Sequence, residues 1–154
     1  MQPHPEGGYF KETYRSEEII SKDGLPARFA GNRNISTAIY YLLEQGDFSA
    51  FHRIKSDECW HFYAGETLLI HMIDNAGNYS CIKLGHHLVD SERFQFVVPA
   101  GIWFASEPAL NTPFALVGCT VATGFDFTDF QMADQNELLK DNRQHETIIK
   151  RLSR

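Results

Sequence analysis

Two ionisable side chains, His52 and Glu58, lie close together within the segment 46–65, GDFSAFHRIKSDECWHFYAG. An imidazole can take up a proton near neutral pH, and a carboxylate can orient that imidazole or exchange the proton with it. The same two groups could bind a divalent metal ion, or they could form a buried hydrogen-bonded pair that only stabilises the fold. The first question is therefore whether the chain brings them together.

The alternation of side chains along β-strands predicts that His52 and Glu58 lie close together. In a strand, every second side chain points to the same face, so positions 52 and 54 share one face, as do positions 58, 60 and 62. We expect His52 and Glu58 to meet inside a pocket. Trp60 and Phe62 would share that side, either stacked on a planar or sugar-like ligand or packed as ordinary core.

Other residues extend this candidate site. His71, in TLLIHMID, could face the same pocket and add a third metal ligand. Glu12, Tyr14 and Arg15 lie close together on an N-terminal run. They form either a polar-faced edge strand or the rim of a binding site that recognises a charged group.

The elements that would position these residues are short β-type runs separated by turn formers. Nine runs are rich in β-branched and aromatic residues, and the tetrapeptide Asn75-Ala76-Gly77-Asn78 is the clearest hairpin. This pattern predicts an all-β sandwich or barrel in a single domain over residues 1–154. From Asp134, apolar residues recur at helical spacing, which predicts a short C-terminal helix packed on the barrel exterior or on a partner subunit.

The composition argues against two kinds of binding partner, nucleic acid and membrane. The net charge is −6, and no stretch gathers the lysines and arginines that phosphate-backbone binding needs, so we expect no nucleic acid. No run of apolar residues is long enough to cross a membrane, and the N-terminus is neither basic nor apolar. The three cysteines are widely separated and are interpreted as reduced thiols. These features predict a soluble, cytoplasmic protein.

The segment from Gly46 to Gly65 resembles the first cupin motif, G(X)5HXH(X)3EX(6)G, with Ile54 in place of the second histidine. Residues 99–104, PAGIWF, resemble the core of the second cupin motif, with Phe104 in place of its histidine. The resemblance implies a double-stranded β-helix, or jelly-roll barrel. In metal-dependent cupins the four motif positions hold iron or manganese. Since Ile54 and Phe104 cannot coordinate, we expect no cofactor or a weakly held divalent metal, and Phe104 could instead contact a ligand.

The N-terminal run HPEGGYFKETYR resembles a family of small cupins of unassigned activity, over nearly the whole chain. That family's folds are similar to the dTDP-sugar epimerases of the rhamnose pathway, which need no metal. In those enzymes the catalytic histidine sits near the position of His52. The resemblance therefore favours isomerase or epimerase chemistry with His52 as base.

Three functions follow as hypotheses. The leading one is a metal-independent cupin that binds a small polar metabolite, such as a sugar or nucleotide-sugar, and acts as an isomerase or epimerase through His52 and Glu58. The second is a metal-dependent oxygenase or decarboxylase with a reduced shell of His52, Glu58 and His71. The third is a non-catalytic ligand-binding module. Cupins of this size usually pair through exchanged edge strands, so a homodimer is expected.

Overall fold

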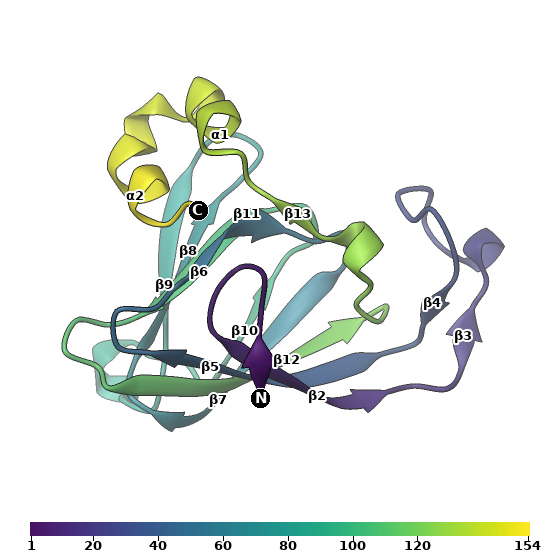
Figure 1. The fold of residues 1–154 in the computed structure, drawn as a ribbon, viewed down its shortest axis with the longest axis horizontal. Coiled ribbons are helices and arrows are strands. Elements are labelled where there is room, and N and C mark those ends of the chain that lie inside the picture. The colour runs from purple at the N-terminus through teal and green to yellow at the C-terminus, as the bar shows by residue number, and fades with distance from the viewer.

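Two facing antiparallel sheets form the body of the protein in a computed structural model that describes residues 1–154 (Figure 1). The first sheet, in spatial order, contains β1 (Gln2–Pro3), β2 (Tyr9–Arg15), β5 (Thr37–Glu44), β12 (Phe114–Ala122), β7 (Asp57–Gly65) and β10 (Gln95–Val98). The second contains β13 (Gln131–Met132), β6 (Ser49–Arg53), β11 (Trp103–Pro108), β8 (Leu68–Ile73) and β9 (Tyr79–Leu84). A separate ribbon pairs β3 (Ile19–Ile20) with β4 (Arg33–Asn34). The helices are α1 (Gln135–Asp141) and α2 (Glu146–Arg151).

The predicted all-β architecture is confirmed, because each of the nine β-type runs contains one strand, β2 or one of β5 to β12. The predicted hairpin joins β8 to β9. Its turn is stabilised by Asp74, whose side chain accepts hydrogen bonds from the backbone N–H groups of Ala76 and Asn78 at 2.9 and 2.8 Å. Gly77 takes the positive φ, 79°, that this turn requires.

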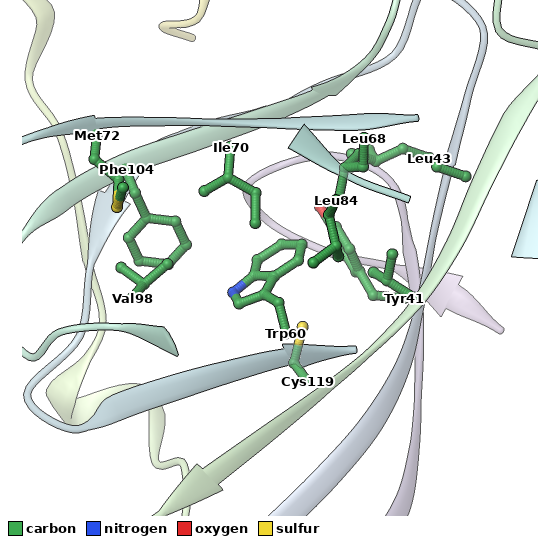
Figure 2. Packing of buried hydrophobic residues seen from close by; sticks show 12 residues of the cluster. Tyr41, Leu43, Trp60, Leu68, Ile70, Met72, Leu84, Val98, Phe104 and Cys119 are labelled. Carbon is green, nitrogen blue, oxygen red and sulfur yellow. The ribbon is translucent and has the colours of Figure 1, made fainter. Parts of the chain in front are cut away.

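The main core lies between the two sheets. Twelve buried residues form it, and Trp60 lies at its centre, as Figure 2 shows. The second sheet contributes alternate residues of β8, namely Leu68, Ile70 and Met72, as the two-residue period of a strand requires. Burial of this apolar face holds the sheets together.

A second apolar cluster covers the outer face of the second sheet. Asp134 caps α1 by accepting a hydrogen bond from the backbone N–H of Glu137 at 2.9 Å, as the sequence predicted. The apolar stripe of the tail packs onto the sheet through Leu138, Ile149 and Leu152, in contact with Phe51 and Ala105 among others. The tail therefore packs on the barrel exterior.

The tail forms two helices rather than one, because Asn142 lies between them with a non-helical backbone (φ −134°, ψ 42°). The two helical segments are seven and six residues long. Neither is long and apolar enough to cross a membrane.

Candidate functional site

A cavity of about 300 Å³ opens between the two sheets and contains the predicted centre of the site. Its walls come from β2, β5, β7 and β12 of the first sheet, from β6 of the second, and from two segments outside the sheets. The first of these segments, around His4 and Glu6, precedes β2, and the second, around Phe127, follows β12. His52, Ile54, Glu58 and Trp60 all line the cavity, as strand alternation predicted.

His52 lies at the inner end of the cavity, with 2% of its surface exposed. Its Nδ1 lies 2.8 Å from the Ala50 carbonyl oxygen. A carbonyl can only accept a hydrogen bond, so Nδ1 carries a proton. In the neutral imidazole Nε2 is then an acceptor, and it lies 3.1 Å from Oε2 of Glu6, within reach of a hydrogen bond from that carboxyl in its protonated form. The backbone thus fixes the tautomer that leaves a basic nitrogen beside a carboxyl group.

Glu6 is the partner of His52 that the sequence analysis missed. The run HPEGGYF contains it, but we interpreted that run only as a family signature. Gly7 and Gly8, at φ 118° and 66°, form the turn that brings Glu6 into the cavity. A side chain on Gly7 would overlap the Phe48 carbonyl oxygen, so only glycine fits there.

Hydrogen bonds tie this N-terminal turn to the barrel. The backbone N–H of Ala50 donates to the Glu6 carbonyl at 2.8 Å. The Tyr41 hydroxyl donates to the Gly7 carbonyl at 2.6 Å, and the Gly8 N–H donates to the Asp47 carboxylate at 3.0 Å. Glu6 is therefore held beside His52 by contacts with three separate parts of the barrel.

The prediction that Glu58 orients His52 is wrong. No hydrogen bond or ion pair joins the two side chains, and the Ala50 carbonyl and Glu6 hold the imidazole instead. The reason is their position: His52 projects from β6 in the second sheet, whereas Glu58 projects from β7 in the first. The two groups line the cavity from opposite sheets.

Burial shifts all three ionisable groups at the inner end toward their neutral forms. It raises the pKa of Glu58 from 4.5 to about 7, and it raises the pKa of Glu6. It lowers the pKa of His52 below 6.5. Glu58 therefore titrates near neutral pH, the range in which general acid–base catalysis is most effective, and the opposite shifts of Glu6 and His52 bring the pKa values of that pair closer together.

Of the N-terminal residues predicted to form a rim, Glu12 and Arg15 line the cavity and Tyr14 does not. Strict alternation would place residue 15 on the face opposite residue 12. The pairing of β2 with β5 instead shifts register between Glu12 and Tyr14, which inserts one extra residue, Thr13. This bulge turns Arg15 toward the cavity and leaves Tyr14 55% exposed on the outer face.

Of the three aromatic residues predicted to contact a ligand, only one lies in the cavity wall. Trp60 lines the cavity, whereas Phe62 lies farther along β7 and packs near His86, with ring centroids 5.6 Å apart. Phe104 does not line the cavity: it lies behind His52, with ring centroids 4.0 Å apart, and Figure 2 shows it near Met72 and Val98 in the core. Phe62 and Phe104 are therefore core residues.

The prediction that His71 adds a metal ligand is wrong. In β8, Met72 faces the core and His71 therefore faces the opposite side of the sheet. There its Nδ1 lies 2.8 Å from the Tyr79 hydroxyl, and its Nε2 lies 3.1 Å from Oε1 of Glu107. Both ring nitrogens have partners, and neither faces the cavity.

The cavity residues do not fit the four-ligand metal site of the metal-dependent cupins. Ile54 and Phe104 offer no electron pair, and His71 lies across the sheet. Only Glu66, His86 and His87 form a group of three donors within 4.8 Å of one another, and they are exposed residues outside the cavity. The reduced shell considered as an alternative is therefore not assembled.

Aromatic residues around the cavity mouth form a second feature that sequence reasoning missed. Phe125, Phe127 and Phe130 follow β12, and their ring centroids lie 5.0 to 6.3 Å from one another. His4 stacks against Phe127 at 5.9 Å. The clustering of phenylalanines after residue 124 was visible in the sequence, but nothing there indicated that they fold back over the barrel.

Comparison with known proteins agrees with this fold. Residues 1–133 match the family model described as the cupin superfamily (DUF985). An uncharacterised protein of Saccharomyces cerevisiae, YML079W, is 33% identical over 146 residues, which are 89% of this chain and 72% of that protein.

Solved structures show the same relationship. Protein SO0799 of Shewanella oneidensis superposes with a TM-score of 0.89 at 39% identity, over 99% of this chain and 90% of that one. A hypothetical protein of Leishmania major superposes with a TM-score of 0.88 at 33% identity, over 99% of this chain and 92% of that one. Oxalate decarboxylase of Bacillus subtilis shares only the fold, with a TM-score of 0.58 at 14% identity over 97% of this chain and 36% of that one. The chain therefore belongs to the cupin superfamily.

Proposed function

We propose that the cavity binds a small polar metabolite and moves a proton on it without a metal ion, as an isomerase or epimerase does. The observation that carries this proposal is the state of His52. Its Nδ1 is bound to the Ala50 carbonyl, so the unprotonated Nε2 faces a carboxyl group in an enclosed, aromatic-lined cavity. A buried base with a fixed tautomer is the main requirement for abstracting a proton.

The positions of the two acid–base groups suit inversion at a carbon centre. His52 projects from one sheet and Glu58 from the other, so a ligand between them meets one group on each face. Nε2 of His52 takes the proton from a carbon beside a carbonyl, and the electron pair moves onto the carbonyl oxygen as an enolate. Glu58 in its protonated form then returns a proton to the opposite face of that carbon.

Glu6 assists by its charge. A carboxylate 3.1 Å from Nε2 stabilises the imidazolium that forms when His52 accepts a proton. Because burial raises the pKa of Glu6, this carboxyl can also hold the proton itself between turnovers. The pair can therefore store the abstracted proton without solvent access.

The cavity size indicates a small ligand. A volume of about 300 Å³ lies at the lower end of the range for metabolite pockets. A monosaccharide-sized molecule suits this space, whereas a whole nucleotide-sugar would extend beyond it. Similarity to the nucleotide-sugar epimerases stays a prediction.

Hydrogen–deuterium exchange tests the proposal. A panel of small aldoses, ketoses, amino sugars and other carbonyl metabolites is incubated with the protein in D₂O containing a chelator, and mass spectrometry measures deuterium at carbon. We expect exchange in at least one compound, and a loss of about 100-fold or more in the variant His52→Gln.

A matched control is His61→Gln, because His61 lies outside the cavity and bonds to Thr120. That variant should exchange at the wild-type rate. Exchange by His52→Gln at the wild-type rate would contradict the proposal. Saturable binding of a panel compound without any exchange would favour the non-catalytic binding module instead.

A further inference from the structure

The ionisable groups around the cavity are mostly acidic. Four carboxyl groups line it, from Glu6, Glu12, Glu58 and Asp126, against one guanidinium, from Arg15. Glu6 and Glu58 are buried, so wherever they are ionised water screens their charges poorly, and a cation beside them favours the ionised form. The hydrogen bonds from Thr128 hold the pKa of Asp126 below its ordinary value, so this carboxylate at the cavity is ionised.

Arg15 is not free to bind an anionic ligand. Its Nε and one terminal nitrogen bind the Glu12 carboxylate, at 3.0 and 2.7 Å. The other terminal nitrogen binds the Asn34 side chain at 3.0 Å and the Phe125 carbonyl at 3.1 Å. The guanidinium therefore neutralises Glu12 and anchors the aromatic segment. Of the remaining three carboxyls, Asp126 has Arg33 and Arg15 as cationic neighbours, whereas Glu6 and Glu58 have only histidines.

The apolar part of the cavity is aromatic on several sides. Phe125, Phe127 and Phe130 form one wall, and Phe10 and Trp60 lie on others. The face of an aromatic ring carries partial negative charge and attracts cations, most strongly where water is excluded. Carboxylates together with aromatic faces form a site for a positively charged organic group, whereas a phosphate or diphosphate group would be repelled.

We propose that the ligand of this cavity is a small organic ammonium ion, with its charged nitrogen toward Glu6 and Glu58 and its carbon substituents against Phe127 and Phe130. This proposal rests on the proposed function, because it names the class of ligand for the same cavity. It adds that the ligand is selected by positive charge. A substrate of this class carries an amino or quaternary ammonium group beside its reacting carbonyl.

A pair of probes with the same shape and different charge tests the proposal. Choline and 3,3-dimethylbutan-1-ol differ chiefly in that a quaternary nitrogen replaces a carbon. Isothermal titration calorimetry on the full chain measures both affinities above pH 7, where Glu58 is ionised. Choline is expected to bind at least about tenfold more tightly, because cation–π contacts and poorly screened carboxylates act only on the cation.

Two variants locate the effect. Glu58→Gln keeps the shape of the side chain and removes its charge, so it should weaken choline binding about tenfold and leave the alcohol unchanged. Glu66→Gln is the control, because Glu66 is exposed and lies outside the cavity; it should change neither affinity. Circular dichroism verifies that each variant is folded.

The outcomes separate the two proposals. Equal affinities for the two probes, tighter binding of the alcohol, or no binding of choline would overturn the ammonium proposal. None of these results bears on proton exchange in the panel of carbonyl compounds, which tests the proposed function by itself. Loss of choline binding in Glu66→Gln would place the bound cation outside the cavity and also overturn the proposal.

Discussion

Replacing Glu58 with glutamine is expected to stabilise the protein at alkaline pH and to leave its stability unchanged in acid. Burial raises the pKa of this carboxyl from 4.5 to about 7, so between these values the folded chain keeps a proton that the unfolded chain releases. Wild-type stability therefore falls as the pH rises through this window. At 1.36 kcal/mol per pKa unit, the full loss is about 3 kcal/mol above pH 7.

Urea denaturation measures this effect. The free energy of unfolding is determined for wild type, Glu58→Gln and the exposed control Glu66→Gln at pH values from about 5 to about 8. The difference between wild type and Glu58→Gln should grow by about 2.5 kcal/mol across this range, because the loss has already begun at pH 5, whereas Glu66→Gln should follow wild type. Glu6 is also buried and is present in all three proteins, so its own burial cancels from the difference, and only its repulsion with Glu58 is lost in Glu58→Gln.

Parallel curves for wild type and Glu58→Gln would refute the reasoning, because they would mean that Glu58 titrates alike in the folded and unfolded chains. A growing difference would show that the protein tolerates a buried carboxyl that reduces its stability at neutral pH. Such a cost is common at functional sites, where stability is lower than the fold could provide.

Other predictions concern the fold, the metal and the assembly. Gly7→Ala should lower the free energy of unfolding by about 1 to 3 kcal/mol, measured by urea denaturation, because Gly7 has φ 118° and no room for a side chain; an unchanged value would contradict the proposed turn. Ile149→Ala, at a fully buried position on the inner face of α2, should cost about 2 to 5 kcal/mol, and a loss under 1 kcal/mol would mean that α2 packs loosely. Protein purified without a metal-binding tag should contain no stoichiometric metal by elemental analysis, and EDTA should not change its melting temperature; a fall in melting temperature would reveal a metal. Light scattering at micromolar concentration tests the homodimer expected from the sequence, and a monomer would contradict it.

Much of the architecture could be predicted because local patterns determine it. The period of two placed His52 and Ile54 on one face and Glu58 and Trp60 on another, and both pairs line the cavity. Asp134 marked the start of the first helix. These features depend on neighbours within a few residues, so the sequence contains them directly.

The rest depends on contacts between distant parts of the chain. Glu6 reaches His52 only because the glycine turn folds the N-terminus back over β6. Arg15 faces the cavity only because Thr13 is an extra residue that forms a bulge in β2. The sequence of this run contains no signal of that bulge. His71 was misplaced because the number of residues in the turn after Gly65 decides which face of β8 meets the core.

The state of His52 is the most direct test of the proton-transfer site proposed for the cavity. Nitrogen NMR of protein labelled with ¹⁵N-histidine reports which ring nitrogen carries the proton and at what pH the second one becomes protonated. The expected result is a neutral ring protonated at Nδ1, with a pKa below 6.5, because burial disfavours the imidazolium. A ring protonated at Nε2, or one that stays doubly protonated well above neutral pH, would contradict a base directed into the cavity.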